Sequence, residues 1–152
     1  MVRKQTFDLI RKWEDLRLEA YLDVAGVPTI GYGHTEKVKM GDTCTAEQAE
    51  AWLVGEAEWF QKGVLGSCKI APTPNQLTAM VSFTYNLGLG NLRSSTLLRM
   101  HNAGNFARAA NEFLRWNKAR HPETKQLREV PGLTARRKEE REMYLTPKGE
   151  QA

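Results

Sequence analysis

The chain has 152 residues, of which 41% are hydrophobic and 26% charged, and its formal net charge is +4 at pH 7. This composition is typical of one globular domain spanning residues 1–152 and excludes fibrous and low-complexity proteins. No apolar run approaches the ~20 residues of a membrane span, and the N-terminus lacks the apolar core of a signal peptide. We therefore expect synthesis in the cytoplasm and no stable insertion into a membrane.

Charge is distributed unevenly along the chain. Residues 1–70 carry a net charge of −2, whereas residues 71–152 carry +6. A basic half beside an acid-bearing half would attract a polyanionic ligand. Nucleic acid and an anionic cell-wall polymer both fit this pattern, and charge alone does not separate them.

The cysteines and histidines do not indicate a metal site or any other cofactor. Cys44 and Cys68 lack the close spacing of a metal-binding or redox motif. The three histidines, at positions 34, 101 and 121, are scattered along the chain. We expect two reduced thiols, and a disulfide formed after export would be incidental.

The first segment is predicted to be a helix that ends at about residue 14. Leu9, Ile10 and Trp13 recur at helical spacing and define a buried stripe. Glu14 follows this stripe at the C-terminal end of the helix, where the helix dipole disfavours negative charge. A solvated surface glutamate is the simplest interpretation of such a residue, but the segment that follows favours a chemical role.

Residues 20–34 are predicted to form a β-hairpin with a turn at Gly26-Val27-Pro28. Asp23, just before this turn, is a second candidate acid, although a turn-capping role is its simpler interpretation. Glycine within a strand often marks the close approach of a ligand or of another backbone segment. On the return strand, one face would carry Thr29, Gly31 and Gly33, and the other Ile30, Tyr32 and His34.

The rest of the chain is predicted to be mainly helical. Thr45 and Gln48 form a capping box that begins one helix, and Pro74 suits the first position of another. We expect Gly63, Gly66 and Pro72 to end the first of these helices, and the second to reach Gly88. Further along, we expect a loop over 88–96, a short helix at Leu97-Leu98, a helix capped by Asn105, an irregular loop over 117–132, a last helix capped by Thr134, and six frayed residues at the C-terminus.

One helix, a small hairpin and about five further helices predict an α+β domain that is mostly helical. Residues 1–70 would form a small mixed lobe with a linking helix, and residues 71–152 a larger helical lobe. A cleft between the two lobes would have Glu14 and Asp23 at its floor.

Two acids and a hydroxyl beside one tight turn suit the hydrolysis of a glycosidic bond. This reaction needs an acid that protonates the leaving oxygen and a carboxylate that activates water or attacks the sugar. Glu14, beside an apolar stripe, suits the first role, and Asp23, in a polar turn, suits the second. Thr29 could help to hold the water. Glu14, Asp23 and Thr29 are therefore the candidate catalytic residues.

The same segment resembles the catalytic segment of the phage-type lysozymes, the endolysins of glycoside hydrolase family 24. The shared pattern is Glu, Arg-Leu, Tyr, an Asp nine residues after the Glu, and Thr-Ile-Gly-x-Gly-His. The resemblance continues through nearly the whole chain, in Thr-Pro-Asn-Gln-Leu, Asn-Leu-Gly, Ser-Thr-Leu-Leu-Arg, Pro-Gly-Leu and the arginine pair 136–137.

This resemblance implies an inverting muramidase that cleaves the β-1,4 bond between N-acetylmuramic acid and N-acetylglucosamine in bacterial peptidoglycan and lyses the host cell. Glu14 would be the general acid, with Asp23 and Thr29 serving the water. The residues implied to contact the substrate or to support Glu14 are His34, Tyr85, Asn86 and Arg137, with Arg136 as the alternative to Arg137 in supporting Glu14. The resemblance also implies a monomer that reaches the wall after a holin has permeabilised the membrane.

One departure from the family pattern and two alternative functions remain open. Asp15 stands where the family usually has glycine, which leaves the pH optimum open. A lytic transglycosylase acts on the same substrate with one catalytic acid, so the pair of Asp23 and Thr29 argues against it. A helical nucleic-acid binder would use the basic run 136–138, but residues 134–152 hold 5 bases and 4 acids, which is typical of a solvated helix.

Overall fold

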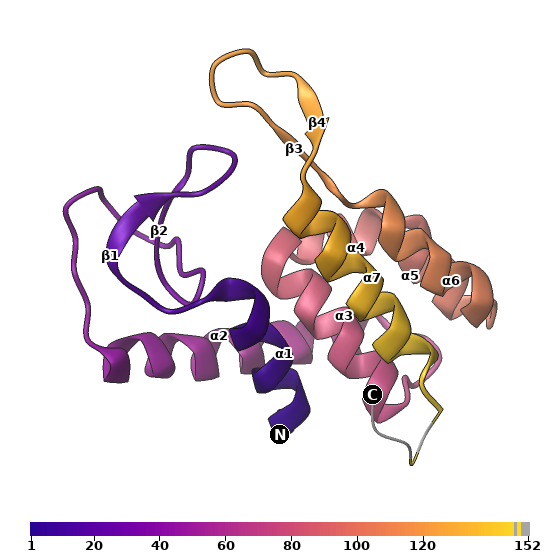
Figure 1. Cartoon of the computed structure of the whole chain (residues 1–152). Helices are drawn as coiled ribbons and strands as arrows, with labels where there is room; N and C mark the ends of the chain where they lie inside the picture. The colour runs from indigo at the N-terminus through magenta and orange to yellow at the C-terminus, as the bar shows by residue number, and fades with distance from the viewer. Residues whose placement is uncertain (148, 150–152) are drawn as a thin grey trace.

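The computed structural model describes residues 1–147 and 149. The long helix α2 connects a small group of elements near the N-terminus to a larger group of helices (Figure 1). The α+β, mostly helical class predicted from the sequence is confirmed. In chain order the elements are α1 (Lys4–Glu14), β1 (Arg17–Leu22), β2 (Pro28–Gly31), α2 (Ala46–Ser67), α3 (Pro74–Leu87), α4 (Leu89–Ser94), α5 (Thr96–Asn102), α6 (Phe106–Glu112), the 3-10 helix η1 (Phe113–Arg115), β3 (Lys118–Arg120), β4 (Leu127–Glu129) and α7 (Pro131–Leu145).

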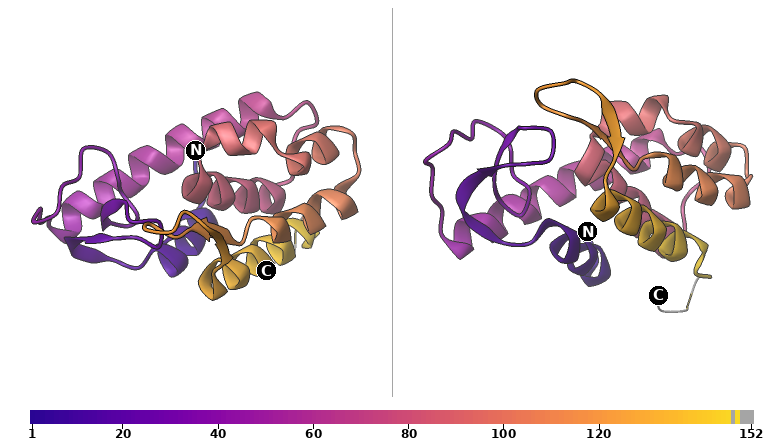
Figure 2. Two further views of the ribbon diagram at one scale, coloured as in Figure 1. Left: turned by 90° about the horizontal axis from the view of Figure 1, so that it is seen from above. Right: turned by 45° about the horizontal axis from the view of Figure 1, so that its top comes forward.

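Helix α3 is the centre of the larger group. It contacts α1, α2, α4 and α7, and Figure 2 shows it lying among the other helices. Residues 78–85 are all buried. Its start follows from local sequence, because Thr73 and Gln76 form a capping box and Pro74 occupies the first turn. Because α3 is surrounded by other elements, α1 from the start of the chain and α7 from its end both pack against it. The candidate site contains residues from all three helices.

The small hairpin differs from its prediction at one end. Strands β1 and β2 pair in antiparallel register, with Tyr21 opposite Thr29. The return strand ends at Gly31, and the backbones of Ile30 and His34 exchange hydrogen bonds of 2.9 and 2.8 Å. The predicted alternation as far as His34 is therefore wrong, because the chain reverses over residues 31–33, where both glycines have positive φ.

Several expectations for the second half are also wrong. Residues 89–94 are helical, and the expected loop over 117–132 contains the hairpin β3–β4. Thr134 lies inside α7, because Pro131 begins this helix three residues earlier. The cap at Asn105 is confirmed, since its side chain accepts a hydrogen bond from the backbone N–H of Arg108. Of the C-terminal residues expected to fray, 148 and 150–152 lie outside the described residues.

Helix α2 ends at Ser67, between the expected end signals Gly66 and Pro72. It continues through Gly63 because Gly63 is a packing position. A methyl group added at Gly63 would lie 2.4 Å from the side chain of Leu89, at the start of α4. Gly63 therefore admits the buried Leu89 instead of ending the helix. Gly55, in the same helix, has nothing within 4 Å of such a methyl group.

These two glycines give a matched test of the packing. Gly63→Ala should lower the free energy of unfolding by about 1–3 kcal/mol, because Leu89 must leave its place in the core. Gly55→Ala should raise it by about 0.5–1 kcal/mol, through helix propensity alone. Urea unfolding followed by circular dichroism measures both changes. Two variants of equal stability would contradict the packing role of Gly63.

Candidate active site

A cleft of 290 Å³ lies between the small hairpin and the helical group. It is lined by residues from four regions: α1, the β1–β2 hairpin with its following loop, the C-terminal end of α3, and the start of α7. Five of the residues predicted from the sequence line it: Glu14, Asp23, Thr29, Tyr85 and Asn86. His34 and Arg137 are not among its lining residues.

Glu14 is the last residue of α1, and its side chain is enclosed on two sides. A methyl group added at Gly33 would lie 2.6 Å from a carboxylate oxygen of Glu14. On another side, Nη1 of Arg136 donates a hydrogen bond of 2.7 Å to Oε2 of Glu14. Asp15 is exposed and has a φ of 26°, in a region that non-glycine residues rarely adopt. The backbone therefore turns sharply after the candidate acid, and glycine at 33 lets the loop close on it.

Of the two candidate arginines, Arg136 reaches Glu14 and Arg137 does not. Arg137 instead donates a hydrogen bond of 2.9 Å to Oδ1 of Asn86, and it has no exposed surface. Successive residues of a helix point about 100° apart. The rotation of α7 about its own axis is set by its packing on α3. In this rotation the side chain of Arg136 points to the cleft and that of Arg137 points to the C-terminal end of α3.

A buried network holds both arginines. The Glu140 carboxylate lies 3.2 Å from Nε of Arg136 and 2.8 Å from Nε of Arg137, and it also accepts a 2.6 Å hydrogen bond from Ser82. Burial alone would lower the pKa of Arg136, but Glu14 and Glu140 outweigh it and raise that pKa. Burial lowers the pKa of Arg137 to about 10, which leaves it charged at neutral pH. The network thus joins two guanidinium groups to the carboxyl groups of Glu140 and Glu14.

Asp23 is fixed by the turn that it precedes. Its Oδ1 accepts hydrogen bonds of 2.9 Å from the backbone N–H groups of Ala25 and Val27. The turn-capping role considered for Asp23 is therefore present in the structure, together with a place in the cleft wall. Because one oxygen is held by two donors, the carboxylate has a defined orientation on the side of the cleft formed by the hairpin.

Thr29 is buried beside Asp23 on the same wall. Its hydroxyl donates a hydrogen bond of 2.8 Å to the carbonyl oxygen of Val27. The hydroxyl proton is thus used within the turn, and the oxygen keeps lone pairs that can accept a hydrogen bond. Thr29 can therefore accept a hydrogen bond from a water molecule in the cleft.

Tyr85 connects the helical group to the loop that encloses Glu14. Its hydroxyl donates a hydrogen bond of 2.5 Å to the carbonyl oxygen of Tyr32. Burial, followed by the nearby carboxylates of Glu56 and Glu14, raises the pKa of Tyr85 above its ordinary value. Tyr85 therefore stays a neutral donor, and it combines a core position with a place in the cleft wall.

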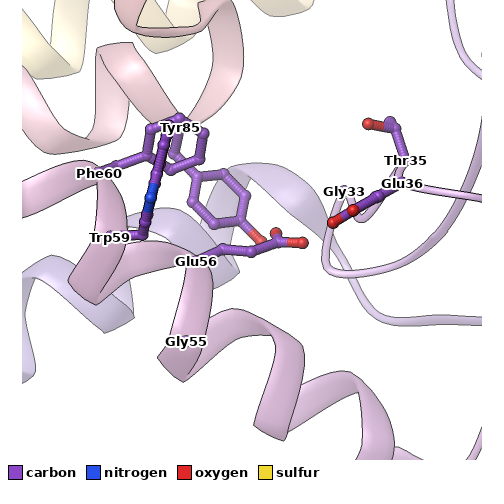
Figure 3. Close-up of a pocket in the computed structure, with 8 residues that line it drawn as sticks. All are labelled: Gly33, Thr35, Glu36, Gly55, Glu56, Trp59, Phe60 and Tyr85. Carbon is purple, nitrogen blue, oxygen red and sulfur yellow. The ribbon is translucent and has the colours of Figure 1, made fainter. Parts of the chain in front are cut away.

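His34 lies behind the loop and supports a residue that the sequence analysis missed. Its ring stacks on Trp52 at 4.2 Å, and its Nδ1 contacts Oε1 of Glu56. Glu56 extends toward Tyr85 (Figure 3). Glu56 lies four residues after Trp52 and four before Phe60, so an acid interrupting an apolar helical stripe was the available signal.

Known proteins similar to this chain are lysozymes and endolysins. The family model described as phage lysozyme matches residues 11–140. An endolysin of Bacillus phage B103 is 44% identical over 142 residues, which are 91% of this chain and 52% of that protein. This chain thus spans about half the length of that relative. Several further relatives are named SAR-endolysins.

Two solved structures share the fold over nearly their full length. An endolysin from Escherichia coli O157:H7 phage FAHEc1 has a TM-score of 0.83 and 40% identity, covering 95% of this chain and 93% of that one. The muramidase domain of SpmX from Asticaccaulis excentricus has a TM-score of 0.85 and 32% identity, covering 97% of this chain and 99% of that one.

The buried network generates a prediction about stability. Arg136→Ala should lower the free energy of unfolding by about 3–5 kcal/mol, because Glu14 and Glu140 lose their shared counterion. Lys138→Ala, at an exposed position of the same helix, should leave it nearly unchanged. Urea unfolding at neutral pH measures both. Unfolding of the two variants at the same urea concentration would show that Arg136 does not stabilise the fold.

Proposed function

Because this chain belongs to the phage lysozyme family, we propose that it hydrolyses the β-1,4 bond between N-acetylmuramic acid and N-acetylglucosamine in peptidoglycan. One observation carries the proposal. The Glu14 carboxylate, held between Arg136 and the Gly33 backbone, lines the same cleft as Asp23 and Thr29. A cleft lined by two carboxyl groups suits the hydrolysis of a glycosidic bond bound in it.

In the proposed reaction, Glu14 is the general acid. It gives its proton to the glycosidic oxygen as the bond between that oxygen and the anomeric carbon breaks. A water molecule, which donates a hydrogen bond to the Asp23 carboxylate and another to the Thr29 hydroxyl oxygen, attacks the anomeric carbon from the opposite face. Asp23 takes the proton of this water, and the new hydroxyl has the inverted configuration. The orientation of Asp23 by its turn favours the attack.

The proposal also covers the route to the substrate. We infer that the chain acts on the wall as a monomer after a holin has permeabilised the membrane, as the family commonly does. None of the described helices is long and apolar enough to cross a membrane. Induction of the gene in a bacterial host, with and without a co-expressed holin, tests this route. Equal lysis in both cultures would contradict the need for a holin.

The reaction is tested by replacing each acid with its amide. Glu14→Gln keeps the shape of the side chain but cannot protonate the leaving oxygen, so the rate should fall by ~10²–10⁴-fold. Asp23→Asn should inactivate the enzyme as well, because an amide cannot accept the proton of the water. Release of reducing sugar from purified peptidoglycan measures the rate. The anomer of the new reducing end reports inversion, and anhydro-sugar ends would instead show a lytic transglycosylase.

Asp15→Asn is the control for both amides, because Asp15 is an exposed acid next to Glu14. It should keep most of the maximal rate, and only its pH optimum should shift. Circular dichroism establishes that each variant is folded. A folded Glu14→Gln variant that releases reducing sugar at the rate of the unchanged chain would disprove the assignment of the acid.

Electrostatic recruitment to the wall gives a further prediction. The β3–β4 hairpin exposes Lys118, Arg120, Lys125 and Arg128. Lysis of cell walls should therefore decline as salt rises through physiological strength, where the screening length is about 8 Å. A variant with Arg120→Gln and Arg128→Gln should show a weaker salt dependence. The same salt dependence in this variant and the unchanged chain would exclude the hairpin as the recruiting surface.

A further inference from the structure

A second hollow, of 450 Å³, adjoins the Glu14 cleft (Figure 3). Gly33, Thr35 and Tyr85 line both hollows, so the two meet along one groove. The volume lies within the range of roughly 300–1,000 Å³ that is typical of ligand sites. The other lining residues come from the loop after Gly33 and from α2: Glu36, Gly55, Glu56, Trp59 and Phe60. The reaction proposed above uses none of these five.

Trp59 is the most exposed aromatic residue of this hollow. It is 63% exposed, whereas tryptophan is highly buried on average. Phe60 holds it edge to face, with ring centroids 5.2 Å apart and an interplanar angle of 78°. Figure 3 shows the rings of Trp59, Phe60 and Tyr85 on one side of the hollow, with Thr35 and Glu36 on the other. A large aromatic ring beside polar groups suits a pyranose, whose C–H face is apolar and whose hydroxyls are polar.

The charge of the hollow selects between the two sugars of peptidoglycan. Glu36 and Glu56 are its charged lining residues, and none of the eight residues lining it is a lysine or an arginine. N-acetylmuramic acid bears a lactyl group that carries the anionic peptide stem, and these two carboxylates would repel it. N-acetylglucosamine carries no charge and would not be repelled.

We propose that Trp59 is the platform on which an N-acetylglucosamine unit of the glycan strand packs. This inference rests on the proposed function and adds a residue that determines specificity. The two sugars alternate along the strand, so holding one kind at Trp59 fixes which kind lies over Glu14. Trp59 would thereby direct cleavage to one of the two kinds of β-1,4 bond in the strand.

Binding is tested with chitotetraose, a neutral oligomer of N-acetylglucosamine, in the Glu14→Gln background, where hydrolysis does not interfere. Calorimetric titration should show about ten-fold weaker binding for Trp59→Ala, as expected for the loss of one stacked ring. Trp59→Tyr keeps an aromatic face and should restore most of the affinity. Leu65→Ala is the matched control, because Leu65 is an exposed apolar residue of α2 outside the hollow. Equal affinity of Trp59→Ala and its parent for chitotetraose would show that the sugar does not pack on Trp59.

Specificity is tested by the ends that hydrolysis creates. The unchanged chain should release fragments that end in N-acetylmuramic acid, and Trp59→Ala should add fragments that end in N-acetylglucosamine. Mass spectrometry of borohydride-reduced products distinguishes the two ends. If Trp59→Ala released fragments with only N-acetylmuramic acid ends, Trp59 would not determine which bond is cleaved, and the proposed function would still stand. If the unchanged chain released no fragments, the proposed function would fail, and the titration would still decide whether Trp59 binds sugar.

Discussion

The contact between Arg136 and Glu14 is the interaction on which both the fold and the candidate site depend. The guanidinium of Arg136 binds Glu14 from α1, Glu140 from α7 and the backbone carbonyl of Ser82 in α3. It therefore joins the first, the central and the last helix of the chain. Without Arg136, the partly buried Glu14 would lose its arginine partner and the buried Glu140 would keep Arg137 alone, which would be strongly destabilising. Stability of the helical group and orientation of the candidate acid thus follow from the same buried charges.

The sequence predicted an element correctly where the residues that determine it are neighbours in the sequence. The cap at Asn105 and the starts of α2 and α3 depend on residues three apart, and they were predicted correctly. Helix α4 lacks such a signal, and its first residue, Leu89, is fixed by packing against Gly63. The choice of Arg136 over Arg137 depends on the rotation of α7 against α3, which no local pattern contains.

The candidate site likewise has one part that could be predicted from neighbouring residues and one part that could not. Glu14, Asp23 and Thr29 lie close together in the sequence and surround one turn, so their place in one cleft could be predicted. The neighbouring hollow could be recognised only in the structure, because α2 brings Glu56 and Trp59 against the loop at residues 33–36, which lies before the start of α2. On that face of α2 the sequence shows only an acid, Glu56, between the aromatic residues Trp52 and Phe60, and this pattern does not identify a groove.

The surface charge is also smaller and more localised than the +6 of residues 71–152 suggests. Arg136 and Arg137 are buried, and their charges are balanced by Glu140 and by Glu14 from the other half. The exposed basic residues of the β3–β4 hairpin remain, and this hairpin reaches across to the small lobe. Figure 1 shows the β3–β4 hairpin extending toward the β1–β2 hairpin. A methyl group added at Gly26 would lie 3.1 Å from Pro122. Val130, at the base of the hairpin, lines the Glu14 cleft, so these basic residues belong to a segment that leads away from the cleft wall. An anionic polymer attracted by the hairpin would therefore arrive next to Glu14 and Asp23.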